Sequence, residues 1–155
     1  MTIQRRIDKE HLVTTYVSGH VSLPQLLSSV LQGGQLTGDC NEHWELILLD
    51  QERLIINPHD RVRLEVAHAA KEMLQFRTQG AIAIVTGTLA SHKLGDILAG
   101  LLRGDAVPVT VFDDEVAARR WLSIHMGSAT SEATVLMMPA KSNKSTSLPH
   151  HSFRH

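Results

Sequence analysis

The sequence has little of several features that mark large classes of protein. A single cysteine, Cys40, excludes an internal disulfide and a cysteine-rich zinc site. Phe, Trp and Tyr make up only 4% of the chain, which argues against the stacked aromatic side chains that hold single-stranded nucleic acid. No run approaches the roughly 18 consecutive apolar residues that a membrane-spanning helix needs, so no membrane span is expected.

Neither sign of charge is in excess. The chain carries 15 Lys and Arg against 16 Asp and Glu, a formal net charge of −1. A protein so close to neutrality has no strong field to attract nucleic acid or an anionic membrane surface. Residues 1–6 lead straight into further charged residues without an apolar segment, so no secretory signal is expected and the protein is predicted to be cytoplasmic.

Length and composition predict one domain followed by a tail. The 155 residues suit a single domain. Residues 1–126 hold 12 Lys and Arg and 15 Asp and Glu, whereas residues 127–155 hold three Lys and Arg and one Glu. This second segment is rich in Ser, Thr, Pro and His. We therefore expect a domain over 1–126 and a flexible, poorly ordered tail over 127–155. An apolar patch at 135–138 could dock that tail on a sheet edge or groove.

Two hydrophobic periodicities alternate along the first 126 residues. The β-branched stretch 12–17 predicts a strand that residues 3–7 join as a hairpin. Short, continuous apolar runs are typical of parallel strands that are covered on both faces. Such runs occur at 45–49, at 81–85 and at 107–112.

Helix signals separate these strands. Ser22 and Gln25 can form a capping box, which predicts a helix that ends at Gly33-Gly34. Apolar residues three and four apart predict three more helices. The first of these covers about 60–77, and the second is capped by Ser91 and contains Leu94. The third is a short last helix that Asp113 or Asp114 caps and that presents Val116, Ala117, Trp121 and Leu122. The alternation of strands and helices predicts an α/β domain with a mixed, mostly parallel sheet and an antiparallel element at the N-terminus.

Three stretches resemble a known family. They are residues 17–26, which contain a Gly-x-Val-Ser turn, the strand end Leu48-Leu49-Asp50, and residues 109–122, which read VTVFDDEVAARRWL. Together they resemble the small bacterial STAS domains, related to sulfate transporters and anti-sigma-factor antagonists, over roughly residues 3–123. The resemblance implies a SpoIIAA-like sheet of about five strands with about four helices, and a regulatory or protein-interaction role. Many proteins of this subgroup have no known function.

The family's phosphorylation site is not matched. Anti-sigma-factor antagonists carry a phosphorylated Ser or Thr in the loop after the central strand, where a helix N-terminus stabilises the phosphate. The corresponding loop is predicted here over residues 50–60, with Asp50 at its start and Pro58 and His59 at the acceptor place. The resemblance therefore implies a domain without the usual phosphoacceptor serine, with a phosphohistidine at His59 as the alternative.

Enzyme signatures are missing from the sequence. There is no Gly-x-Ser-x-Gly elbow, no Walker A loop and no Gly-x-Gly-x-x-Gly. The histidines before the tail lack the i, i+4 spacing of a zinc helix. No cofactor and no metal are expected.

One place on the predicted fold could bind a ligand or a partner. In open α/β sheets ligands bind at the carboxyl ends of the strands, where the predicted loops 50–60, 86–92 and 113–114 would meet. Their polar residues could hold a small anion or a partner's acidic side chain, or form an ordinary polar surface. The candidates are Asp50, Asn57, His59, Asp60, Thr88, Ser91 and His92.

Three functions follow as hypotheses. The first is a non-catalytic regulatory or interaction domain, which binds another protein or a second copy of itself, with Leu89 and Leu94 as exposed apolar contacts. The second is a binder of a small apolar or anionic ligand. The third is an enzyme that uses His59 or His92 with a nearby Asp. An exposed apolar patch favours the first, a cavity the second, and a His–carboxylate pair in a cleft the third. We predict the interaction role.

Overall fold

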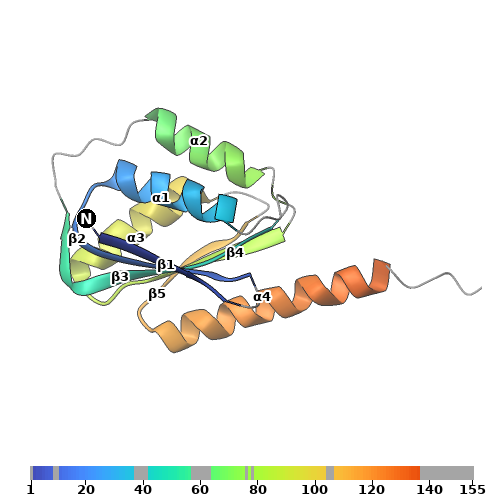
Figure 1. The fold of residues 1–155 in the computed structure, drawn as a ribbon. Helices are drawn as coiled ribbons and strands as arrows, with labels where there is room; N and C mark the ends of the chain where they lie inside the picture. The colour runs from blue at the N-terminus through green and yellow to red at the C-terminus, as the bar shows by residue number, and fades with distance from the viewer. Residues whose placement is uncertain are drawn as a thin grey trace, which may run out of the picture.

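The computed structural model describes residues 2–8, 11–36, 42–56, 64–75, 77, 79–103 and 107–136. These residues form an α/β structure with a five-stranded sheet and four helices (Figure 1). None of the described helices is both long enough and apolar enough to cross a membrane. In chain order the elements are β1 (Thr2–Ile7), β2 (Val13–Val21), α1 (Leu23–Leu36), β3 (Glu42–Ile56), α2 (Leu64–Gln75), β4 (Gln79–Val85), α3 (Leu89–Leu102), β5 (Val109–Phe112) and α4 (Glu115–Leu136).

The sheet follows the order of the chain, β1-β2-β3-β4-β5. β1 pairs antiparallel with β2, and the other three pairings are parallel, which confirms the predicted mixed, mostly parallel sheet. Because each parallel crossover moves to the next strand with the same hand, the crossover helices lie on the same face. Figure 1 shows α1, α2 and α3 together on one face and α4 on the other.

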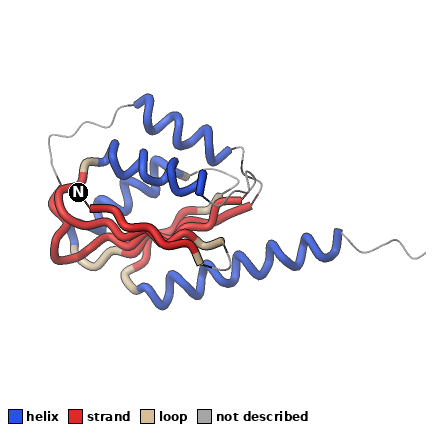
Figure 2. The backbone as a smooth tube through the Cα atoms, viewed as in Figure 1, coloured by secondary structure: helices blue, strands red, loops and turns tan. Residues whose placement is uncertain are grey.

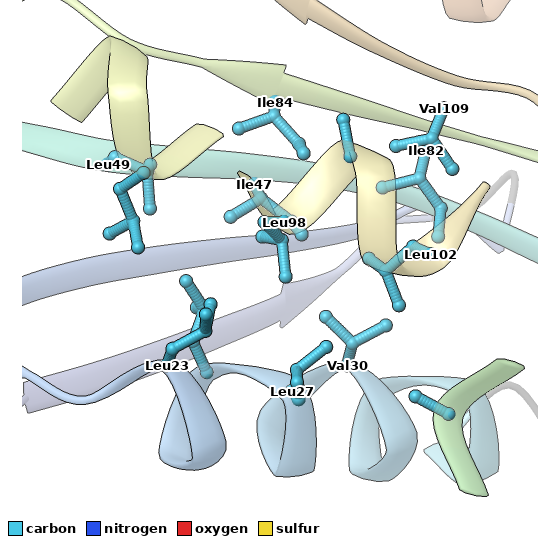
Figure 3. Close-up of a cluster of buried hydrophobic side chains, with 14 of the residues drawn as sticks. Leu23, Leu27, Val30, Ile47, Leu49, Ile82, Ile84, Leu98, Leu102 and Val109 are labelled. Atoms are coloured by element: carbon cyan, nitrogen blue, oxygen red, sulfur yellow. The ribbon is translucent and has the colours of Figure 1, made fainter. Parts of the chain in front are cut away.

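Two hydrophobic clusters lie on the two faces of this sheet. On the first face, Leu27 and Val30 of α1 point toward Leu98 and Leu102 of α3, above Ile47 of β3 (Figure 3). On the second face, the cluster joins α4 to β3 and β4. Its buried members are Leu12, Trp44, Leu46, Ala81, Ala83, Val85, Ala118 and Leu122. The runs 45–49 and 81–85 are therefore strands covered on both faces, as predicted.

The first helix begins as predicted but runs further. The backbone N–H of Gln25 donates to Ser22 Oγ at 3.3 Å, and Gln25 Oε1 accepts from the Ser22 N–H at 3.4 Å, so the predicted capping box is present. The expected end at Gly33-Gly34 is wrong, because α1 continues to Leu36. Gly33 serves a close approach instead: a Cβ at this position would lie 3.2 Å from Glu45 Oε1 in the strand below.

The predicted loop 50–60 is wrong over its first half. Residues 50–56 belong to β3, so Asp50 lies inside a strand and does not start a loop. The second half of β2 supplies the pairing partners, with Gly19 opposite Leu54 and Val21 opposite Ile56 after a register shift between Val17 and Gly19. Gly19 adopts φ 84° at this irregularity, a conformation that costs glycine little.

The last helix also differs from the prediction. α4 has 22 residues and passes the expected boundary at 126 to reach Leu136, and its end extends past the sheet (Figure 2). Asp114 caps it, since its Oδ2 accepts the Ala117 N–H at 3.0 Å. From this start, Ala118 and Leu122 face the sheet one turn apart, while Val116, predicted to face the core, is 64% exposed. Residues 137–155, including the second half of the apolar patch, lie outside the described residues.

Candidate functional site

Two of the three predicted loops meet at the carboxyl ends of β4 and β5. Thr88 is the N-cap of α3, and its hydroxyl accepts the Ser91 N–H at 3.1 Å. Ser91, predicted to be the cap, is the third helical residue: its buried hydroxyl donates to Thr88 O at 3.0 Å and accepts the Gly87 N–H at 3.2 Å. Both candidates thus shape the start of α3, which fixes the position of the next residue, His92.

His92 connects the start of α3 to the end of β5. Its Nδ1 lies 3.2 Å from Thr86 Oγ1 and 3.3 Å from Asp113 Oδ1. Its Nε2 lies 3.6 Å from Asp96 Oδ2, one helical turn further along α3. We refer to Thr86, His92, Asp96 and Asp113 as the His92 cluster. The side chain of His92 is 42% exposed and that of Asp113 86% exposed, so water reaches the pair from the surface.

The other predicted site residues do not join this cluster in the described structure. Asp50 lies within β3, and nothing of its side chain is described. Asn57, His59 and Asp60 lie outside the described residues. Of the three loops predicted to meet, the described structure therefore brings two together, those at residues 86–92 and 113–114.

Apolar side chains stand exposed beside the His92 cluster. Leu89, the first residue of α3, is 75% exposed and lines a surface hollow of about 460 Å³ with Thr88, His92 and Asp113. The prediction that Leu94 is also exposed is wrong, because Leu94 is buried against the sheet. The difference follows from the helical spacing: Leu94 falls on the face of Leu98, and Leu89 does not.

A larger cavity lies on the face of the sheet that α4 leaves partly open. It has a volume of about 550 Å³ and lies beside the start of α4. Its lining residues come from β1 to β4, from the turn before α4 and from the first residue of α4: Thr2, Gln4, Tyr16, Val17, Ser18, Leu48, Leu49, Val85, Asp113, Asp114 and Glu115. The acidic wall does not suit the small anion that the sequence suggested. The sequence analysis considered the loop 113–114 that forms one wall, but it missed the strand residues of the other walls, because nothing in the sequence shows that Tyr16 is exposed.

A polar group is buried between the inner strands β2 and β3, beneath α1. His43 Nε2 lies 2.9 Å from Glu45 Oε2, and the Thr15 hydroxyl donates to Glu45 Oε1 at 2.7 Å. His43 is 2%, Glu45 0% and Thr15 1% exposed. His43 belongs to β3, which begins before the predicted apolar run 45–49. Nothing in the sequence pattern distinguished these side chains from surface ones, because period-two alternation does not identify a polar residue that faces a core.

Within the described ranges, no group of three or more His, Cys, Asp and Glu side chains could hold a metal ion. Comparisons with protein-family models, with curated proteins and with solved structures find no match to this chain.

Proposed function

We propose that this chain is a STAS-like regulatory or protein-interaction domain that binds its partner at the carboxyl ends of the strands. The observation that carries the proposal is the exposed His92–Asp113 pair beside the exposed side chain of Leu89. Charged groups around an apolar contact are a common composition for a protein interface. The capping box at Thr88 and Ser91 orders the start of α3 before binding, and such preorganisation lowers the entropy cost of binding.

The same geometry gives less support to the enzyme alternative. Both nitrogens of His92 already face oxygen atoms, those of Thr86 and Asp113 on one side and of Asp96 on the other. The neighbouring Ser91 hydroxyl is engaged in the cap of α3, so it is not poised as a nucleophile for His92. A His–carboxylate pair this open to water also lacks the dry environment that strengthens catalytic electrostatics.

Site-specific photo-crosslinking in the protein's own host tests the interaction role. A benzophenone amino acid replaces Leu89, and a matched variant carries it at Ile124, which is also apolar and 61% exposed but lies on α4. We expect a discrete covalent adduct from position 89 and none from position 124. The adduct from position 89 should weaken when His92→Ala or Asp113→Arg is added. Equal labelling at both positions, or no adduct at position 89, would overturn the proposal.

The cavity beside Tyr16 supports a second candidate function, the binding of a small ligand. Its volume of about 550 Å³ is in the range of small-molecule sites, and Tyr16 is 45% exposed within it. The acidic wall and the aromatic ring favour an apolar or cationic molecule over an anion. Native mass spectrometry of the protein from its host should then show a mass increment that Tyr16→Ala removes, and the bare chain mass would count against this candidate.

A further inference from the structure

The outer edge of β5 lies at the bottom of a groove. Among the described residues β5 ends the sheet and pairs only with β4, so no described strand bonds the backbone groups on its other side. The groove has a volume of about 480 Å³ and runs between this edge and one side of α3. Its walls are His92, Asp96, Ala99, Gly100 and Arg103 of the helix side and Val109, Thr110 and Val111 of the strand. An extended strand added here would complete the sheet edge.

The two edges of the sheet differ in how they are protected. β1 carries Arg5 and Arg6 in its second half, and charges on an edge strand oppose the addition of another strand. β5 has the sequence VTVF, without a charge, and only Pro108 before it limits pairing at its start. The β5 edge, which lies beside the groove, is therefore the edge without charged residues that would oppose strand addition.

The helix side of the groove carries opposite charges on the two sides of its middle, and His92 lies one turn beyond Asp96, with its Nε2 3.6 Å from Asp96 Oδ2. Asp96, 60% exposed, stands toward the carboxyl end of β5, and Arg103, also exposed, stands toward its start. Gly100 lies between them, and a Cβ at this position would meet nothing within 4 Å, so the middle of the groove is open. The seven residues from Asp96 to Arg103 correspond to about 10 Å along the helix.

This pattern is self-complementary. When two identical strands pair antiparallel about a two-fold axis, the start of one lies beside the end of the other. An axis near Gly100 would therefore bring Arg103 of each copy to Asp96 of the other, and the open middle would let the two α3 helices approach. A partner with a uniform charge would match only one of these two side chains.

We infer that the groove binds a second copy of this chain, with the two β5 strands antiparallel and the two sheets joined into one. The inference rests on the proposed function in taking this end of the molecule as a protein-binding surface, and it names the partner. It uses the β5 edge and the side of α3, whereas Leu89 lies beyond the groove at the start of the helix.

Sedimentation velocity over a concentration series tests the pairing with two glycine variants. Gly100→Trp fills the groove, and Gly127→Trp is the matched control, because Gly127 is also helical, exposed and without atoms within 4 Å of an added Cβ. The wild type and the Gly127 variant should form dimers. Gly100→Trp should weaken dimerisation by at least about tenfold, equal to about 1.4 kcal/mol. A wild-type chain that stays monomeric, or a Gly100 variant that dimerises like the wild type, overturns the inference.

Charge reversal gives a second test that does not alter the groove's shape. Arg103→Glu and Asp96→Arg each place like charges opposite one another and should each weaken the dimer by about tenfold. The double variant restores opposite charges at both ends and should dimerise nearly as well as the wild type. Failure of this rescue, with all three variants folded, would exclude the two-fold arrangement.

The two proposals fail in different ways. If the wild type is monomeric but position 89 still yields an adduct larger than two chains, the second-copy inference fails and the interaction role stands. If the dimer forms and the charge rescue works, but position 89 labels no better than position 124, the surface around Leu89 is rejected and the groove remains.

Discussion

The carboxylate of Glu45 lies so close to Gly33 that a side chain there would be in tight contact with it. A Cβ added to Gly33 would lie 3.2 Å from Oε1 and 3.3 Å from Oε2 of Glu45. Those two oxygens are also held from other directions, Oε1 by the Thr15 hydroxyl and Oε2 by His43 Nε2. The glycine in α1 and the buried polar group in the sheet therefore depend on each other, although they are 12 residues apart in the chain.

Gly33→Ala should reveal this dependence. Replacing a helical glycine by alanine ordinarily stabilises a protein by about 0.5–1 kcal/mol. At Gly33 the new methyl group must displace a carboxylate that two hydrogen bonds hold, so we expect the gain to vanish or become a loss of about 1 kcal/mol. Gly127→Ala is the control, because Gly127 is also helical, lies outside the groove, and its added methyl group meets nothing within 4 Å, so it should give the full gain. Urea unfolding measures both, and equal gains would contradict the close approach.

The pair His43–Glu45 should be strongly coupled in stability. Removing one partner leaves the other polar group buried, which costs about 3–5 kcal/mol, whereas replacing both by apolar residues costs much less. We therefore expect His43→Leu and Glu45→Leu each to destabilise the protein more than the double variant does. A double-mutant cycle by urea unfolding gives the coupling energy, and additive effects would show that the two side chains do not interact.

The sequence predicted the layers of this fold better than its boundaries. Apolar runs such as 45–49 report burial on both faces directly, so the strands and the mostly parallel sheet were predictable. The ends of elements depend on long-range partners that a local pattern does not contain. Residues 50–56 extend β3 because β2 reaches alongside them, and Gly33 lies within α1, where its missing side chain leaves room for Glu45.

The candidate site was predictable to a similar degree. The topological rule placed it at the carboxyl ends of the strands, and His92 with Asp113 lies there. The roles within it were not predictable, because a Ser three residues after a Thr can serve as the cap or as its reciprocal partner. The structure assigns the cap to Thr88 and the reciprocal position to Ser91.

The packing of α4 against the second face of the sheet should contribute to global stability. Leu122 is 1% exposed and Ile124, two residues later on the same helix, is 61% exposed. Leu122→Ala should lower the free energy of unfolding by about 2–5 kcal/mol through lost burial and the cavity it leaves. Ile124→Ala should change it by less than about 0.5 kcal/mol. Thermal or urea unfolding distinguishes them, and a small effect at Leu122 would mean that α4 does not pack on the sheet.

Asp113→Asn should separate binding from stability. The carboxylate is 86% exposed and faces His92 from 3.3 Å, and such exposed pairs contribute about 0–1 kcal/mol after solvent screening. We therefore expect the free energy of unfolding to change by less than about 1 kcal/mol. The crosslink from position 89 should nevertheless fall severalfold, because the variant removes a charge from the proposed contact surface. The matched control is Asp8→Asn, which alters an exposed carboxylate in the turn between β1 and β2, away from that surface, and should leave the crosslink unchanged. If Asp113→Asn unfolds the protein, His92 and Asp113 are part of its structural framework, and the binding role assigned to them is wrong.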